Sequence, residues 1–169
     1  MNGLLQLCAR IDAFSRLTGR LIAWLVLATV LISVATAFGR KLGMGNNGWL
    51  EVQWYLFSAV FLLGAAHTLE QDRHVRVDVL AKRWSPRVRA GIDLVGHLAF
   101  LLPLILVLAW LGWHDFRQTW MSGEVSADAG GLIRWPVKLL IPLGFGLLAL
   151  QVLSEVGKRL AVLVRGEAS

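Results

Sequence analysis

The sequence predicts an all-α integral membrane protein with four transmembrane helices, both termini in the cytoplasm and a long third helix. Three observations lead to this prediction. Of the 169 residues, 56% are hydrophobic, and they form runs without charge as long as residues 21–38 and 94–113. Such runs match the ~20 residues that a helix needs to cross ~30 Å of hydrocarbon. The 17 Lys and Arg residues, against 11 Asp and Glu, gather beside these runs.

The four spans are expected at about 20–39, 50–69, 92–114 and 137–156, within one membrane domain of residues 1–169. Each is an apolar run bounded by charged or aromatic residues. The first run follows a basic segment and ends near Ala35-Thr36-Ala37, which resembles a signal-peptide cleavage site. Its 18 residues exceed the ~7–15 of a usual signal-peptide core. We therefore expect a retained helix.

The basic residues set the orientation. Twelve lie in the amino end, the middle connection at 70–91 and the carboxyl end, and five lie on the opposite side. Because cytoplasmic loops carry the excess of Lys and Arg, both termini and the middle connection are predicted to be cytoplasmic. A bacterial inner (cytoplasmic) membrane is the expected location. The basic clusters suit anionic phospholipid headgroups, and no nucleic-acid motif accompanies them, so no nucleic-acid partner is expected.

The third span begins with a distinct signal. Ser85-Pro86 offers an N-cap followed by proline at the first helical position. A helix from there to Trp120 would have ~35 residues and measure ~50 Å, so it must tilt, bend or project from the membrane. Pro103 and Pro142 each remove a backbone hydrogen bond and are expected to kink their helices. Before this helix, residues 74–79 alternate polar and apolar with period two, which indicates an extended or surface-lying segment.

Glu51 is the first candidate for chemistry, since a charge at membrane depth is costly. It opens the second span beside Gln53, Trp54 and Tyr55. It is either an ion or proton site, or an interfacial carboxylate that bonds a neighbouring helix or a partner chain. One carboxylate supplies too few oxygen ligands for a hard cation, so the second interpretation is favoured. A small homodimeric exporter that uses Glu51 for proton coupling stays open as an alternative.

Two histidines support a further alternative from another class. Antiparallel spans would bring His67 and His97 to comparable depth, as in a membrane-embedded b-type cytochrome with two histidine ligands. Otherwise the sequence shows no zinc-ligand spacing, nucleophile elbow, phosphate-binding loop or paired carboxylates. The single Cys8 excludes an intramolecular disulfide. We therefore expect no enzyme, no bound cofactor and no metal site.

Several stretches, from about Trp24 to Gln151, together resemble the small membrane subunit of tripartite ATP-independent periplasmic (TRAP) transporters. Many members carry two adjacent acidic residues at the start of the second span, whereas here Glu51 precedes Val52. The stretches that carry the resemblance are Glu51–Phe57, Leu62–Ala66, His74–Val79, Ser85–Arg87 and Gly130–Lys138.

The resemblance implies a small permease subunit of a sodium-coupled, binding-protein-dependent secondary transporter that takes up a small organic acid. In such systems a periplasmic binding protein captures the substrate and a large membrane subunit carries it with sodium. Sodium is thus expected in the large subunit. Four spans with one marginal carboxylate do not build a buried alternating-access site, so this chain is expected to anchor and scaffold the large subunit and help dock the binding protein.

The expected contacts with these partners are packing or interface residues without a catalytic role. Three of them, His74, Arg76 and Asp78, are expected at the cytoplasmic junction with the large subunit or lipid headgroups, the alternative being a solvated, lipid-facing loop. The complete predicted set is Glu51, Gln53, Trp54, Tyr55, Gly64, His67, His74, Arg76, Asp78, Gly130, Gly131, Arg134, Pro136 and Lys138.

Overall fold

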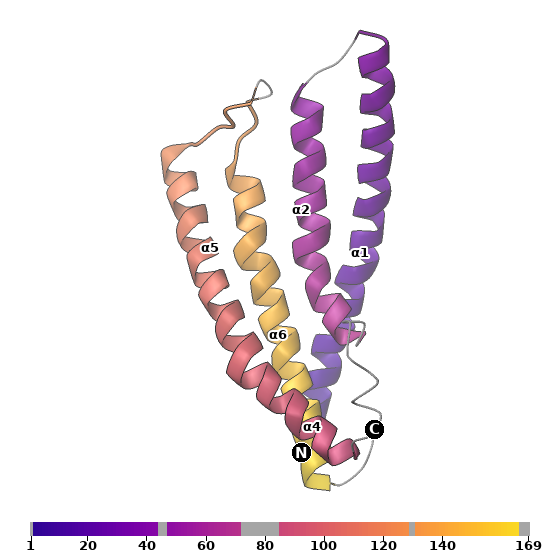
Figure 1. Cartoon of the computed structure of the whole chain (residues 1–169), viewed down its shortest axis with the longest axis vertical. Helices are drawn as coiled ribbons and strands as arrows, with labels where there is room; N and C mark the ends of the chain where they lie inside the picture. Colours follow the sequence, from indigo (N-terminus) through magenta and orange to yellow (C-terminus); the bar gives the residue numbers. More distant parts are fainter. Residues whose placement is uncertain (1, 44–46, 72–84, 129–130, 166–169) are drawn as a thin grey trace.

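The computed structural model describes residues 2–43, 47–71, 85–128 and 131–165. Within these ranges, four helical stretches are long and apolar enough to cross a membrane, which confirms the predicted all-α, four-span class. The start of α1 and the end of α6 lie at the same end of the molecule (Figure 1). The elements in order are α1 (Asn2–Lys41), α2 (Asn47–Glu70), α4 (Pro86–Val95), the π-helical turn η1 (Gly96–Leu101), α5 (Leu102–Ser122) and α6 (Trp135–Arg165).

The helix α1 extends well beyond the predicted first span. It begins at Asn2 and has 40 residues, a length of about 60 Å. The apolar run predicted to cross the membrane forms its second half. Its first half packs against the end of α6, where Cys8 and Ser15 are buried.

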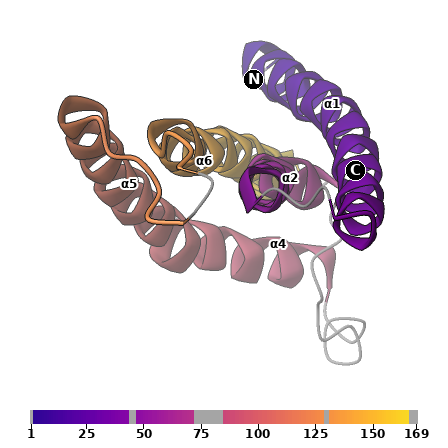
Figure 2. The ribbon, with the colours of Figure 1, turned by 90° about the horizontal axis from the view of Figure 1, so that it is seen from above.

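The third span starts and bends close to where the sequence indicates. Ser85 caps α4 by accepting a hydrogen bond from the Val88 N–H, and Pro86 occupies the first turn. The helical stretch then continues to Ser122, as expected for a long third helix. The turn η1 lies directly before Pro103, whose ring nitrogen has no hydrogen to donate. Extra-residue π turns and proline both bend helices, and Figure 2 shows α4 and α5 running in different directions.

The spans form an open row instead of a closed bundle. α6 packs against α5 on one side and against α2 on the other, and α1 follows beyond α2. Viewed from above, α5, α6, α2 and α1 follow one another across the molecule (Figure 2). In the described part of the chain, α5 makes no extensive contact with α1 or α2. Among the described residues, one broad face of the row is left open, and α4 crosses the other face at the end near the start of α1 (Figures 1 and 2).

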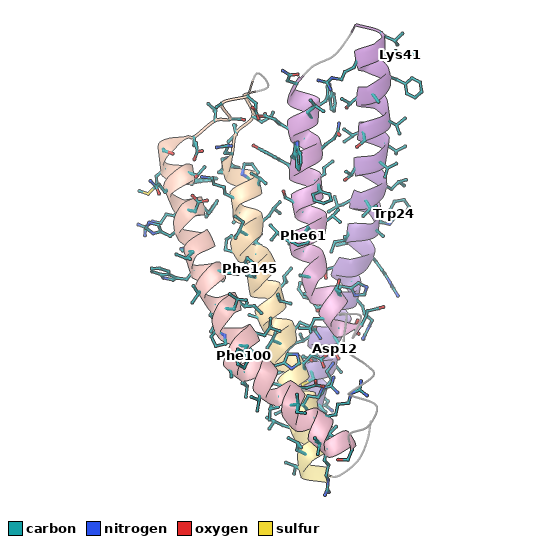
Figure 3. The ribbon with its side chains drawn as sticks, in the orientation of Figure 1. Asp12, Trp24, Lys41, Phe61, Phe100 and Phe145 are labelled. Carbon is teal, nitrogen blue, oxygen red and sulfur yellow. The ribbon has the colours of Figure 1, made fainter. Side chains whose placement is uncertain are left out.

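The buried core formed by the described residues is small. Leu69, Ile105 and Val152 meet where the end of α2, the start of α5 and α6 converge. Many large apolar side chains stay outside, including Trp24 and Phe100 (Figure 3). In a membrane such faces can rest on lipid tails, which are as apolar as leucine, or on another membrane protein. The exposed apolar side chains of the row are thus suited to contact with lipid or with a partner protein.

Candidate partner interface

The loop between α5 and α6 forms an outer polar cluster at the end opposite the termini. Glu124 is its centre, because its carboxylate accepts hydrogen bonds from Lys138 Nζ at 2.9 Å, Arg134 at 3.0 Å and the Thr119 hydroxyl at 3.0 Å. Lys138 also donates to Asp115 at 3.1 Å. These bonds lower the pKa of Glu124 to about 2, the bond from Lys138 contributing most, and the bond to Glu124 raises the pKa of Arg134.

Glu51 and Tyr55 fasten this loop to α2. Glu51 Oε2 accepts the backbone N–H of Leu132 at 3.1 Å, and the Tyr55 hydroxyl donates to the Ile133 carbonyl at 3.2 Å. The loop is closed internally by an antiparallel bridge between Val125 and Ile133. Glu51 is buried, with 6% of its surface exposed. Its first role is therefore to hold a loop of its own chain.

The remaining predicted residues of the outer half divide into inward and outward groups. Gln53 faces α1, donating to Thr36 at 2.9 Å and accepting from Ser33 at 3.2 Å. In contrast, Trp54 is 68% exposed. Gly131 adopts a positive φ of 59° in the loop, a conformation that favours glycine, and Pro136 lies in the first turn of α6. Trp54 is thus the predicted aromatic residue left free for a partner or lipid.

A second, inner polar cluster joins α1 to α6 near the termini. None of its residues was among those predicted from the sequence. Asp12, labelled near the start of α1 in Figure 3, accepts hydrogen bonds from Gln151 at 2.9 Å, Ser154 at 2.8 Å and Lys158 at 3.1 Å. The Ser15 hydroxyl donates to Gln151 Oε1 at 2.7 Å. Gln151 and Ser154 are completely buried.

Ion pairs extend the inner polar cluster to the other helices. Glu155 pairs with Lys158 and, at 3.8 Å, with Arg159. Arg159 also contacts Asp93 of α4 at 3.4 Å. The signal for this cluster was a polar stripe on the fourth span, where residues 151, 154, 155 and 158 share one helix face. The partners on α1 lie in a segment without membrane-like hydropathy, so nothing in the sequence indicated their role.

The two histidines have different surroundings. A Cβ on Gly19 of α1 would lie 2.4 Å from the His67 ring, so that ring is pressed against α1, and its Nδ1 lies 3.6 Å from Glu70. His97 is buried in η1, the turn that contacts α6. This arrangement gives no support to the cytochrome alternative. Among the described residues, no group of three or more His, Cys, Asp or Glu side chains could hold a metal ion.

Some of the residues predicted to contact partners take no part in either polar cluster. A Cβ on Gly64 would meet nothing within 4 Å, so this glycine does not serve a close helix contact within the chain. His74, Arg76, Asp78 and Gly130 lie outside the described residues. The structure therefore brings together Glu51, Tyr55, Gly131, Arg134 and Lys138 around one outer loop.

The geometry supports binding more than chemistry. Most charged groups in the two clusters are matched with partners of the same chain, and the apolar faces between the clusters are exposed. An arrangement of this kind holds helices in fixed positions and presents broad apolar surfaces. It suits contact with lipid and with another membrane protein.

The comparisons with known proteins agree with this interpretation. A family model described as "Tripartite ATP-independent periplasmic transporters, DctQ component" matches residues 29–162. The match extends from the membrane-spanning half of α1 almost to the end of α6. It confirms the resemblance found in the sequence. No individual curated protein and no solved structure gives a significant match.

Proposed function

Because the chain belongs to the DctQ-component family of TRAP transporters, and is thus a multi-pass small permease subunit, we propose that it is the stationary scaffold of its transporter. Membership in this family implies association with the large membrane subunit and the binding protein. The family is one of transporter components and not of enzymes. On this proposal the chain anchors the large subunit in the bacterial inner membrane and helps to dock the binding protein outside.

The observation that carries the proposal is the open row of helices with a polar cluster at each end. The inner polar cluster fixes α1 to α6, and Glu51 and Tyr55 fix the loop that carries the outer polar cluster to α2. Secondary transporters bind their cargo near the middle of the bilayer between parts that move against each other. This row instead has apolar faces between its clusters, so substrate and sodium are assigned to the large subunit.

The cargo and the energy source follow from the family's usual chemistry. We propose that the complete transporter takes up a small organic acid by symport with sodium, and that this chain contributes no cofactor and no ion ligand. Docking of the binding protein is assigned to the outer loop, which is the polar surface at the outer end of the row. The exporter alternative has no supporting contact, because Glu51 is engaged by the Leu132 amide.

Reconstitution in liposomes tests the scaffold role. The large subunit, the binding protein and this chain together should accumulate a small organic acid when a sodium gradient is applied. Omission of this chain should abolish uptake, and this chain alone should transport nothing. Uptake by this chain alone would disprove the scaffold assignment.

A crosslink tests whether the row is stationary. Thr36→Cys and Gln53→Cys replace two side chains in contact across α1 and α2, in a background where Cys8 is changed to Ser. A short thiol crosslinker should leave sodium-driven uptake by the complete transporter unchanged, because a stationary scaffold does not need to separate these helices. The uncrosslinked double variant is the control. Uptake lost on crosslinking alone would mean that α1 moves against α2 during transport.

A further inference from the structure

An open pocket lies at the outer end of α2, next to the outer polar cluster. Its volume is about 260 Å³, and Asn47, Leu50, Glu51, Trp54 and Asp128 line it. Four of these residues belong to the start of α2, and Asp128 comes from the α5–α6 loop. Both charged residues in the lining are acidic, so the pocket is negative.

Glu51 presents a half-satisfied carboxylate to this pocket. Its Oε2 accepts the Leu132 amide, whereas its buried Oε1 has no hydrogen-bond partner among the described residues. The Ser126 hydroxyl, the Asp128 carboxyl and the Arg134 guanidinium all act on this carboxylate. Arg134 is already paired with Glu124, and two neighbouring carboxylates repel each other unless they share a proton or face a cation. A buried carboxylate oxygen without a hydrogen-bond partner is costly, so this geometry favours a further positive group in the pocket.

The lining indicates which positive group fits. A hard metal ion takes about six or more oxygen ligands, but here Leu50 and Trp54 supply apolar walls, and among the described lining residues only three offer side-chain oxygens. The pocket is also several times larger than the ~30 Å³ of one water molecule. A guanidinium group binds carboxylates through two parallel hydrogen bonds and stacks on aromatic rings. Trp54, which is largely exposed, offers such a ring beside the two carboxylates.

We propose that this pocket receives an arginine side chain of the large membrane subunit, which pairs with Glu51 and Asp128 and stacks on Trp54. The inference rests on the proposed scaffold function and deepens it. A permanent partner is favoured over the binding protein, because each release would leave the buried Oε1 of Glu51 without a hydrogen-bond partner. The arginine would fix the position of the large subunit along the row at its outer end.

Co-purification from cells that make both membrane subunits tests the pocket. With the tag on this chain, Glu51→Gln should reduce the apparent affinity for the large subunit by at least about 10-fold, because it removes one charge from a buried pair. Asp128→Asn and Trp54→Leu should weaken it in the same direction. Glu70→Gln is the matched control, since that carboxylate is paired with Arg16 of this chain at the other end of the row. Among Arg→Glu changes at the outer end of the large subunit, one should be rescued by Glu51→Arg.

The outcomes separate this inference from the function on which it rests. Equal affinity of Glu51→Gln and the unaltered chain would overturn the arginine pocket and leave the scaffold standing. An unaltered chain that binds no large subunit would refute the scaffold itself. Loss of binding-protein docking alone, or thermal stabilisation by Na⁺ or Ca²⁺ that Glu51→Gln abolishes, would also overturn the inference. If Glu51→Gln unfolds in detergent, Asp128→Asn decides, because that exposed side chain lies in a loop.

Discussion

The two polar clusters differ in what they connect. The inner polar cluster joins side chains that are far apart in the sequence, such as Asp12 and Gln151, at 139 positions' separation. The outer polar cluster is local, since Glu124 and Arg134 are 10 positions apart. Gln151 and Ser154 of the inner polar cluster are fully buried, whereas the charged side chains of the outer polar cluster are 21–48% exposed and Thr119 is its buried member.

This difference assigns the clusters different tasks. Bonds between distant, buried groups determine which helices are neighbours, and their loss leaves polar atoms without partners. Bonds between the exposed charges of one loop and the helix ends beside it shape that loop and contribute little to overall stability. The inner polar cluster should therefore maintain the row, and the outer polar cluster should maintain a surface for partners.

The largest loss of stability is expected from a substitution at the centre of the inner polar cluster. Asp12→Ala removes the acceptor shared by Gln151, Ser154 and Lys158. Because it removes three hydrogen bonds at about 1 kcal/mol each, and leaves Gln151, Ser154 and Lys158 with fewer partners, we expect a loss of about 3 kcal/mol in the free energy of unfolding. Denaturant titration of the protein in mild detergent, followed by circular dichroism, measures this loss.

The matched variant lies in the outer polar cluster. Asp115→Ala removes a carboxylate that is half exposed and paired with Lys138, so it should cost less than about 1 kcal/mol. If the two alanine variants lost equal stability, the contrast between the clusters would be wrong.

A middle-sized effect is expected where α2 and α6 touch between the clusters. A Cβ on Gly144 would lie 2.7 Å from the Leu62 carbonyl oxygen, which belongs to the backbone of α2. Gly144→Ala should therefore force the helices apart and cost about 1–3 kcal/mol. Gly146→Ala is the control, because its Cβ would meet nothing within 4 Å, and alanine favours a helix by up to about 1 kcal/mol. The same unfolding assay compares the two, and a neutral Gly144→Ala would show that the clusters alone maintain the row.

Features that depend on residues close together in the sequence could be predicted from it. The four spans follow from long apolar runs, and the cap at Ser85 and the bend near Pro103 follow from local chemistry. The interfacial role preferred for Glu51 was close to the observed one, although its partner is a loop of the same chain. The π-helical form of the bend was not predictable, because a proline predicts a kink and not its geometry.

Features that depend on distant pairing could not be predicted. Asp12 has no sequence signal that connects it with Gln151, since their contact depends on how α1 crosses α6. The arrangement of the spans in an open row could not be predicted either, because spans that are apolar on most sides give no indication of which face meets another helix. The extension of α1 to Asn2 was missed because hydropathy detects membrane spans and not the helix that continues beyond them.

The smallest expected effect is a change in the outer loop at low pH. The pKa of Glu124 is lowered from an ordinary 4.5 to about 2, first by the hydrogen bond from Lys138 and then by that from Arg134. Because the folded pKa lies below the unfolded one, the stability it contributes is present above pH 4.5 and is lost as the pH falls toward 2. Trp120 and Trp135 touch edge to face across the loop ends, with ring centroids 4.7 Å apart, so tryptophan fluorescence should change over this range. Glu124→Gln should remove this step, since its side chain has no proton to gain, and an unchanged step would assign it to another carboxylate.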